Sequence, residues 1–82
     1  MKRILDDNKV INITGSNIRK LRREAGLSQR QLSEKMELLA VYTCRGSLSR
    51  IENGQRAVTD IELWAIANVL GVSVNDFFKQ TT

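Results

Sequence analysis

Residues that could hydrogen-bond to bases or phosphates are concentrated on the short segment 44–53. Leu48 and Ile51 are spaced three apart, as on the apolar face of a helix, so we expect them to point inward. Four residues would then point outward: Arg45, Gly46, Ser49 and Arg50. An arginine guanidinium can donate two hydrogen bonds to the O6 and N7 atoms of guanine, or it can neutralise a phosphate. Both alternatives are open for each arginine.

A second group of residues has the chemistry to bind phosphate. Ser28 and Gln29 lie at the expected start of a helix, where unpaired backbone N–H groups and the positive end of the helix dipole attract anions. Further polar side chains lie on the segment 44–53 or just after it: Ser47, Asn53, Gln55 and Arg56. The simpler alternatives are that Ser28 only caps its helix and that Asn53 and Gly54 only end one.

Arg22 places a positive charge where the sequence otherwise predicts buried apolar side chains. It lies in the middle of an apolar stripe formed at helical spacing by Ile18, Leu21 and Ala25. A buried charge without a partner costs several kcal/mol, so a carboxylate elsewhere in the chain is needed to pair with it. The alternative is that Arg22 reaches a phosphate directly.

Five helices are expected to position these residues, and capping patterns mark three of their starts. The pattern S-x-x-Q begins at Ser28, T-x-x-E at Thr59 and S-x-x-D at Ser73. We expect helices over 15–25, from Ser28 through Met36, over 44–53, over 59–70 and over 73–78. No proline, repeat or low-complexity segment interrupts the pattern, so the expected fold is an all-α, compact five-helix bundle.

The connection between the second and third helices is long and apolar. Residues 37–43 contain no glycine that could make a tight turn. Either the second helix continues for one more turn, or the loop packs Leu38, Leu39 and Val41 against the bundle. We expect a mixture of the two, with Leu39 and Val41 buried. Tyr42 would then reach a phosphate or a partner subunit, unless the loop only covers its own apolar groups.

Composition limits the classes of function. The 82 residues carry 13 lysines and arginines against nine acidic residues, a net charge of +4. Residues 1–56 have a balance of +6 and residues 57–82 one of −2, so the basic part of the chain contains the candidate binding residues. One cysteine and no histidine exclude a disulfide framework, a histidine-based metal site and a histidine general base. Without a paired carboxylate motif or a glycine-rich phosphate loop, we expect neither an enzyme nor a cofactor.

The stretch 15–78 resembles the Cro/repressor-type helix-turn-helix family, also called the xenobiotic response element family. Separated motifs carry the resemblance in the family's order: Ile18-Arg19-Lys20-Leu21-Arg22, Gly26-Leu27-Ser28-Gln29, Leu32 and Leu48-Ser49-Arg50-Ile51-Glu52-Asn53-Gly54. The resemblance implies a lambda-repressor-like fold, in which the second helix crosses the DNA backbone and the third enters the major groove. It also implies a partly buried ion pair between Arg22 and Glu52, phosphate contacts from Gln29 and residues 53–56, and a base contact at the position of Gly46. The connection 37–43 departs from the family by about five extra residues.

These observations predict a sequence-specific DNA-binding transcriptional regulator that acts as a repressor. We expect it to read bases in the major groove through Arg45, Gly46, Ser49 and Arg50. We expect it to bind a palindromic double-stranded DNA operator as a homodimer. The alternative is a protein-interaction or antitoxin-like regulatory module on the same fold. We divide the chain into an N-terminal extension, 1–14, and a helix-turn-helix DNA-binding domain, 15–82. No small-molecule ligand is evident, and the absence of an 18-residue apolar run or a signal peptide predicts a cytoplasmic protein without membrane contact.

Three further features leave their role open. A set of apolar residues either closes the core or forms the dimer surface: Trp64, Val69, Val74 and Phe78. Lys2 and Arg3 belong either to a DNA-seeking arm or to a loosely packed extension. Cys44 is expected to be a reduced thiol, because one cysteine cannot form an intramolecular disulfide.

Overall fold

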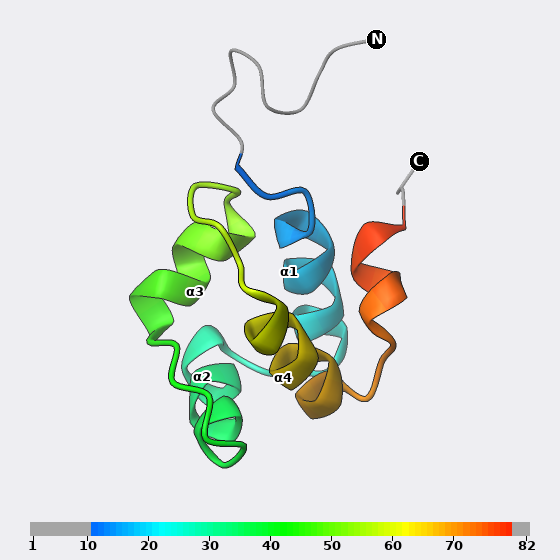
Figure 1. Cartoon of the computed structure of the whole chain (residues 1–82). Helices are drawn as coiled ribbons and strands as arrows, with labels where there is room; N and C mark the ends of the chain where they lie inside the picture. The colour runs from blue at the N-terminus through cyan, green and yellow to red at the C-terminus, as the bar shows by residue number, and fades with distance from the viewer. Residues whose placement is uncertain (1–10, 80–82) are drawn as a thin grey trace, which may run out of the picture.

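The computed structural model describes residues 11–79, which form four α-helices followed by one 3-10 helix (Figure 1). The elements are α1 (Gly15–Glu24), α2 (Gln29–Glu37), α3 (Arg45–Glu52), α4 (Asp60–Leu70) and η1 (Val74–Phe78). This part of the chain contains no strand, so the all-α expectation is confirmed. The fifth helix is present as a single 3-10 segment of five residues. The possible arm residues Lys2 and Arg3 lie outside the described residues.

Side-chain caps begin the helices where the sequence predicts. At α2, Ser28 Oγ accepts a hydrogen bond from the Gln31 N–H (3.0 Å), and the Gln31 side chain accepts one from the Ser28 N–H (2.8 Å). Thr59 and Glu62 form the same reciprocal pair at α4. Each pair satisfies two backbone donors that the first turn of a helix leaves unpaired. The starts of α2 and α4 are therefore fixed locally.

The core is built from one apolar face of each element. Leu48 and Ile51 of α3 are completely buried, as predicted. Ala25 is exposed because α1 ends at Glu24, so the prediction that the apolar stripe extends to Ala25 is wrong. The largest fully buried side chains are Phe77, Ile18, Leu32, Met36, Leu48, Ile51 and Ile66. Burying a side chain of this size contributes about 1.5 to 3 kcal/mol, so packing rather than intrinsic propensity holds these short helices in place.

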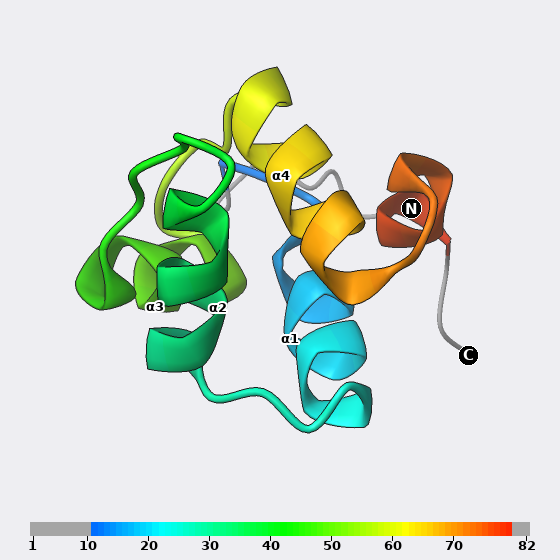
Figure 2. The ribbon, with the colours of Figure 1, turned by 90° about the horizontal axis from the view of Figure 1, so that it is seen from below.

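Helix α1 lies between α3 and η1. It packs against both of them, whereas α2 packs against α3 and α4. Two views of the ribbon, a quarter turn apart, place α3 and η1 on opposite sides (Figures 1 and 2). The candidate binding helix therefore forms one side of the molecule, and the C-terminal element forms the other.

Helix α1 begins in direct contact with the backbone of α3. A Cβ atom added to Gly15 would lie 2.2 Å from the Ile51 carbonyl oxygen and 2.8 Å from that of Glu52. Since those atoms belong to the backbone and cannot swing aside, only glycine permits this approach. The first turn of α1 is thereby seated on the last turn of α3.

The connection after α2 turns back on itself without a glycine. Ala40 adopts a left-handed conformation (φ 61°), the backbone geometry that a glycine would have supplied at lower cost. The Val41 N–H then donates to the Met36 carbonyl (3.2 Å), which brings the Val41 side chain into the core. Leu38 and Leu39 remain exposed on the outside of the turn. The prediction for Val41 is confirmed, and that for Leu39 is wrong because the left-handed turn separates the two side chains.

Glu52 joins three helices through its carboxylate. Arg22 of α1 donates from Nε to Oε2 (2.7 Å) and from Nη2 to Oε1 (3.0 Å), which makes a two-pronged ion pair. Oε1 also accepts from Gln29 Nε2 at the start of α2 (3.0 Å) and from Arg19 Nε (3.4 Å). Burial raises the pKa of the Glu52 carboxyl, but the hydrogen bonds from these three side chains outweigh it, so the pKa is lowered. The carboxylate therefore stays charged inside the protein.

Glu62 of α4 forms a second polar centre. Its carboxylate accepts hydrogen bonds from Thr43 Oγ1 (2.6 Å) and from both terminal nitrogens of Arg56 (3.1 Å each). The Thr43 carbonyl in turn accepts from Ser33 Oγ of α2 (2.6 Å). Burial would raise the pKa of the Glu62 carboxyl, but these donors and the Thr59 N–H lower it to about 2. The chain just before α3 and the chain just after it are thus tied to the same carboxylate.

We predict that the two members of the buried ion pair are not equivalent. Glu52→Gln leaves the guanidinium of Arg22 without a carboxylate and should lower the free energy of unfolding by about 2 to 4 kcal/mol. Arg22→Met should cost less, because Arg19 and Gln29 still donate to the remaining carboxylate. Combining Arg22→Met with Glu52→Leu should cost less than the sum of the two single changes, so these changes are non-additive. Urea denaturation of Glu52→Gln, Arg22→Met, Glu52→Leu and the double variant measures these differences.

The exposed pair of Arg30 and Glu34 on α2 is the control for this experiment. Its two side chains are 76% and 59% exposed. Replacing either by Ala should change the free energy of unfolding by no more than about 0.5 kcal/mol. Similar, additive losses at the exposed pair and at the Glu52 pair would contradict the network described for Glu52.

Acid should destabilise the protein in part through Glu62. Its pKa is about 2 in the folded protein, against about 4.3 in an unfolded chain. Because the folded value is the lower one, the stabilisation is fully present above about pH 5 and is lost as the pH falls toward 2, a change of about 3 kcal/mol. Unfolding free energies measured between about pH 7 and pH 3 should therefore fall more steeply for the wild type than for Glu62→Gln. Parallel curves would show that Glu62 is not held as the structure describes.

Candidate nucleic-acid interface

The outer face of α3 carries two arginines that extend into solvent. Arg45 and Arg50 are exposed, and neither forms an ion pair with any residue between 11 and 79. Ser49, between them, is half-buried. This exposure follows from the inward position of Leu48 and Ile51, which turns the remaining side chains of the helix outward. The structure thus brings the predicted base-reading residues to one exposed helix, with two guanidinium groups available for a ligand.

Gly46 lies on the exposed part of α3. A Cβ atom added there would meet no atom within 4 Å. The fold therefore does not require a glycine at this position, in contrast to Gly15. Its effect is to remove a side chain near the start of the helix, which would let the backbone approach a ligand surface closely.

Gln29 has a structural partner that the sequence did not reveal. Ser28 caps α2, and the neighbouring Gln29 donates one amide hydrogen to Glu52, the last residue of α3. The second amide hydrogen of Gln29 remains available to an anion, as do the backbone N–H groups of Gln29 and Arg30, which the capping box does not use. The bond from Gln29 and the bond from Arg19 to Glu52 join residues 23 and 33 positions apart, and no local pattern in the sequence signals either of them.

The loop after α3 holds its predicted residues in two different ways. Asn53 is exposed at the helix end and its side-chain oxygen accepts a hydrogen bond from Arg19. Gln55 is exposed, and its backbone N–H donates to the Arg50 carbonyl (2.8 Å). Arg56 was expected to bind phosphate, but both terminal nitrogens of its guanidinium are engaged by Glu62. The ion pair with Glu62 therefore gives Arg56 a role in the fold.

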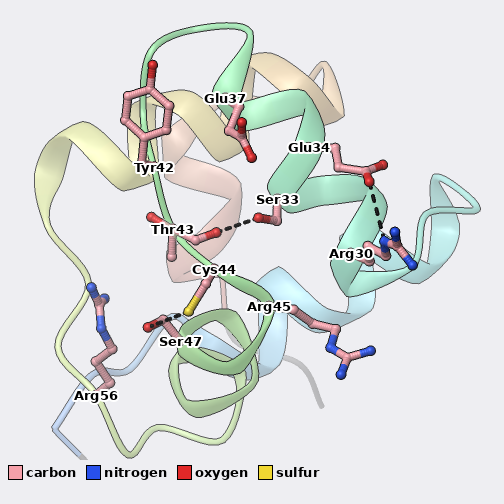
Figure 3. A pocket seen from close by; sticks show the side chains of 10 residues that line it. All are labelled: Arg30, Ser33, Glu34, Glu37, Tyr42, Thr43, Cys44, Arg45, Ser47 and Arg56. Atoms are coloured by element: carbon pink, nitrogen blue, oxygen red, sulfur yellow. Dashed lines mark hydrogen bonds and ion pairs between the residues drawn. The ribbon is translucent and has the colours of Figure 1, made fainter.

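A hollow of about 710 Å³ opens between α2, the connection after it and the start of α3 (Figure 3). Arg30, Glu34 and Glu37 line it from α2, whereas Arg45 lines it from α3. Arg30 is paired with Glu34 across one turn of α2. Tyr42 stands on the connection with its side chain largely exposed. The hollow is therefore lined by side chains of both charges. Of its three arginines, Arg30 and Arg56 are ion-paired, whereas Arg45 of α3 has no ion pair with residues 11–79.

Cys44 immediately precedes α3 and is exposed. Its thiol lies 3.4 Å from the Ser47 hydroxyl (Figure 3). The Ser47 hydroxyl and the backbone N–H groups of the first turn stabilise the thiolate, and the charge of Arg50 adds to this, so the pKa of Cys44 is lowered. Ser47 is thus held at the helix start by Cys44, with its backbone at the positive end of the helix.

Residues 11–79 contain no group of three or more histidine, cysteine, aspartate or glutamate side chains that could hold a metal ion. In the same range, no helix combines the length and the apolar character that crossing a bilayer requires.

Comparison with known proteins places this geometry in a family. The helix-turn-helix family model matches residues 18–77, which includes all five elements except the first turn of α1 and the last residue of η1. An uncharacterized HTH-type transcriptional regulator, y4dJ, from Sinorhizobium fredii (strain NBRC 101917 / NGR234) is 39% identical over 61 residues, which cover 74% of this chain and 73% of that protein. The chain therefore belongs to the helix-turn-helix family of the Cro/repressor type, a family of DNA-binding transcriptional regulators.

Proposed function

We propose that this protein is a sequence-specific repressor that places α3 in the major groove of its operator. The observation that carries the proposal is that α3 is held firmly in the fold while its two exposed arginines have no ion-pair partner within residues 11–79. Its orientation is fixed by Glu52 at one end and by the contacts of Glu62 on both sides, while Arg45 and Arg50 have no ion-pair partner among the described residues. A rigid helix with two available guanidinium groups has the form that direct readout of bases requires. The assignment to repression rests on the resemblance to the Cro/repressor type.

In this proposal Arg45 and Arg50 read bases. Each can donate a pair of hydrogen bonds to O6 and N7 of a guanine, which is worth about 1 to 3 kcal/mol of discrimination against the wrong base. Gly46 allows the helix to approach the edge of the bases, and the half-buried Ser49 contributes a single hydroxyl.

The phosphate contacts come from the two ends of the binding surface. At the start of α2, Ser28 offers its hydroxyl hydrogen, and Gln29 offers its backbone N–H and one amide hydrogen. After α3, Asn53 and Gln55 offer side-chain amides on an exposed loop. Ser47 adds a hydroxyl at the start of α3. Contacts of this kind fix the register of the protein on the duplex and carry no sequence information.

We further propose that two copies bind one operator. A single helix reads only a few base pairs, and a two-fold dimer doubles the site by presenting its helices about 34 Å apart, one turn of DNA. Trp64 and Phe78 are 48% and 50% exposed and are the residues of the expected dimer surface that remain available. Val69 and Val74 are partly buried and pack against the core, which supports a core-closing role for them.

A protein-interaction or antitoxin-like module is the second candidate function. The exposed apolar side chains of Leu38 and Ile61, together with Trp64, favour contact with another protein. These residues lie outside α3, so this function and DNA binding are not mutually exclusive. Recognition of a defined DNA sequence is the property that separates them.

Selection of bound sequences from random DNA tests the proposed function directly. We expect one consensus built from two inverted half-sites whose centres lie about one helical turn apart. Sedimentation of the protein with the selected duplex should show two copies per duplex. A reporter downstream of the selected site should be expressed less when the protein is present. Absence of any consensus would favour the interaction module, and a single copy on a full site would remove the dimer.

Substitutions on α3 should separate base reading from charge attraction. Arg45→Ala and Arg50→Ala should each weaken binding to the selected duplex by about 1 to 3 kcal/mol, roughly five- to more than a hundredfold, and should have much smaller effects on a scrambled duplex. Lys79→Ala removes one positive charge, paired with Asp76 (2.7 Å), from the residue that follows η1. Helix η1 lies on the opposite side of the molecule from α3 (Figures 1 and 2). Lys79→Ala should leave both affinities nearly unchanged. Binding is measured on both duplexes at several salt concentrations, since a lost phosphate contact lowers the salt dependence by about one released counterion.

If Arg45→Ala and Arg50→Ala weaken the two duplexes equally, the arginines bind phosphates and α3 does not read the bases. If Lys79→Ala has an effect as large as theirs, binding depends on net charge rather than on α3.

A further inference from the structure

The side chain of Asn12 connects three parts of the chain. Its Oδ1 accepts hydrogen bonds from the Thr14 N–H (3.0 Å) and the Gly15 N–H (2.8 Å), so it caps the start of α1. Its Nδ2 donates to the Ile51 carbonyl (3.0 Å) and to the Arg56 carbonyl (2.7 Å). Asn12 precedes the segment 18–77 that matches the helix-turn-helix family model.

The two carbonyls that Asn12 binds lie on either side of one loop. Ile51 is in the last turn of α3, and Arg56 is at the far end of the loop that follows it. The Ile11 N–H donates to the Gly54 carbonyl between them (2.9 Å). Residues 11–12 therefore lie along the whole of the segment 51–56 and bind its backbone at three points.

The chemistry of this contact requires an asparagine. Both hydrogens of its amide are used by carbonyls, and its oxygen is used by backbone N–H groups. An aspartate has no hydrogens to donate, so its oxygen would face the two carbonyl oxygens. An alanine would leave the two carbonyls and the two N–H groups without a hydrogen-bond partner from residue 12. The loop that Asn12 holds carries Asn53 and Gln55, two of the residues that we assign to phosphate.

We infer that Asn12 is a positioning residue for DNA binding: it sets the conformation of the loop 53–56 and so places the phosphate contacts beside α3. The expected effect of Asn12 on DNA affinity rests on the proposed function. Its effect on the conformation of the loop 53–56 rests on the structure alone. Residues 11–12, at the end of the segment 1–14 assigned to an N-terminal extension, thus contribute to the binding surface through hydrogen bonds to the backbone of residues 51–56.

Asn17 provides a matched control within the same protein. Its Nδ2 also donates to two backbone carbonyls, those of Phe77 (2.9 Å) and Lys79 (2.6 Å). These carbonyls belong to η1 and the residue after it, on the far side of α1 from α3. Asn12 and Asn17 therefore make the same kind of contact at opposite sides of the fold, and only the first lies near the proposed interface.

The test compares Asn12→Ala and Asn17→Ala under conditions in which thermal melts show both variants to be folded. Asn12→Ala should bind the selected and the scrambled duplex about five- to tenfold more weakly, with the ratio of the two affinities unchanged. The salt dependence should also be unchanged, because no charge is lost. Asn17→Ala should bind within about twofold of the wild type on both. A merely structural role for Asn12 would leave the two folded variants equal in DNA affinity.

Amide hydrogen exchange gives a readout that does not depend on DNA. The Gly54 and Gln55 N–H groups donate to the carbonyls of Ile51 and Arg50, and both should exchange about tenfold faster in Asn12→Ala than in Asn17→Ala. Asn12→Ser, whose hydroxyl can still cap α1, serves as the second variant should Asn12→Ala fail to fold. It should give the same faster exchange and weaker binding.

Exchange at Gly54 and Gln55 that matches the wild type, or DNA affinity unchanged in folded Asn12 variants, would overturn the inference. Failure of the wild type to bind any duplex would refute the proposed function. Together with faster loop exchange in the Asn12 variants, it would overturn only the DNA part of the inference.

Discussion

The carboxylate of Glu52 must keep its charge in the interior, and the arrangement of the first three helices follows from that requirement. Removing a carboxylate and a guanidinium from water costs several kcal/mol for each ion, and their attraction offsets this only when every donor is in place. Arg22 and Arg19 come from α1, and Gln29 comes from the start of α2. The three helices can therefore slide or rotate against one another only by leaving a charge uncompensated. The range of positions that α3 can adopt is thus smaller than apolar packing alone would allow.

The same α3 is also restrained through the chain on both sides of it. Glu62 holds Thr43 before the helix and Arg56 after it, and Ser33 ties that arrangement to α2. All buried side-chain nitrogen and oxygen atoms of the described residues have a hydrogen-bond partner. Because the polar contacts on the inner side of α3 are complete, folding does not depend on its outward side chains, and these can serve binding. Gly46 illustrates this freedom, because the fold would accept a side chain there.

The features that the sequence predicts well depend on residues close together in the chain. The caps at Ser28 and Thr59 join residues three positions apart, and the burial of Leu48 and Ile51 follows from the period of the helix. The features it misses depend on approaches between distant segments. The exposure of Leu39 follows from a left-handed residue in a glycine-free turn, and the bonds of Arg56 and Asn12 require partners six to 44 positions away. Residue type and spacing indicate which groups need partners, whereas the packed helices decide which partners they obtain.

The position of Cys44 makes the protein convenient for spectroscopy. The chain has one cysteine, so a thiol-reactive fluorophore or spin label attaches at one place without prior mutagenesis. The exposure of the thiol and its lowered pKa favour the reactive thiolate form. A probe attached there sits at the first residue before α3. Its mobility and emission would report on the environment at the start of that helix in the unmutated chain.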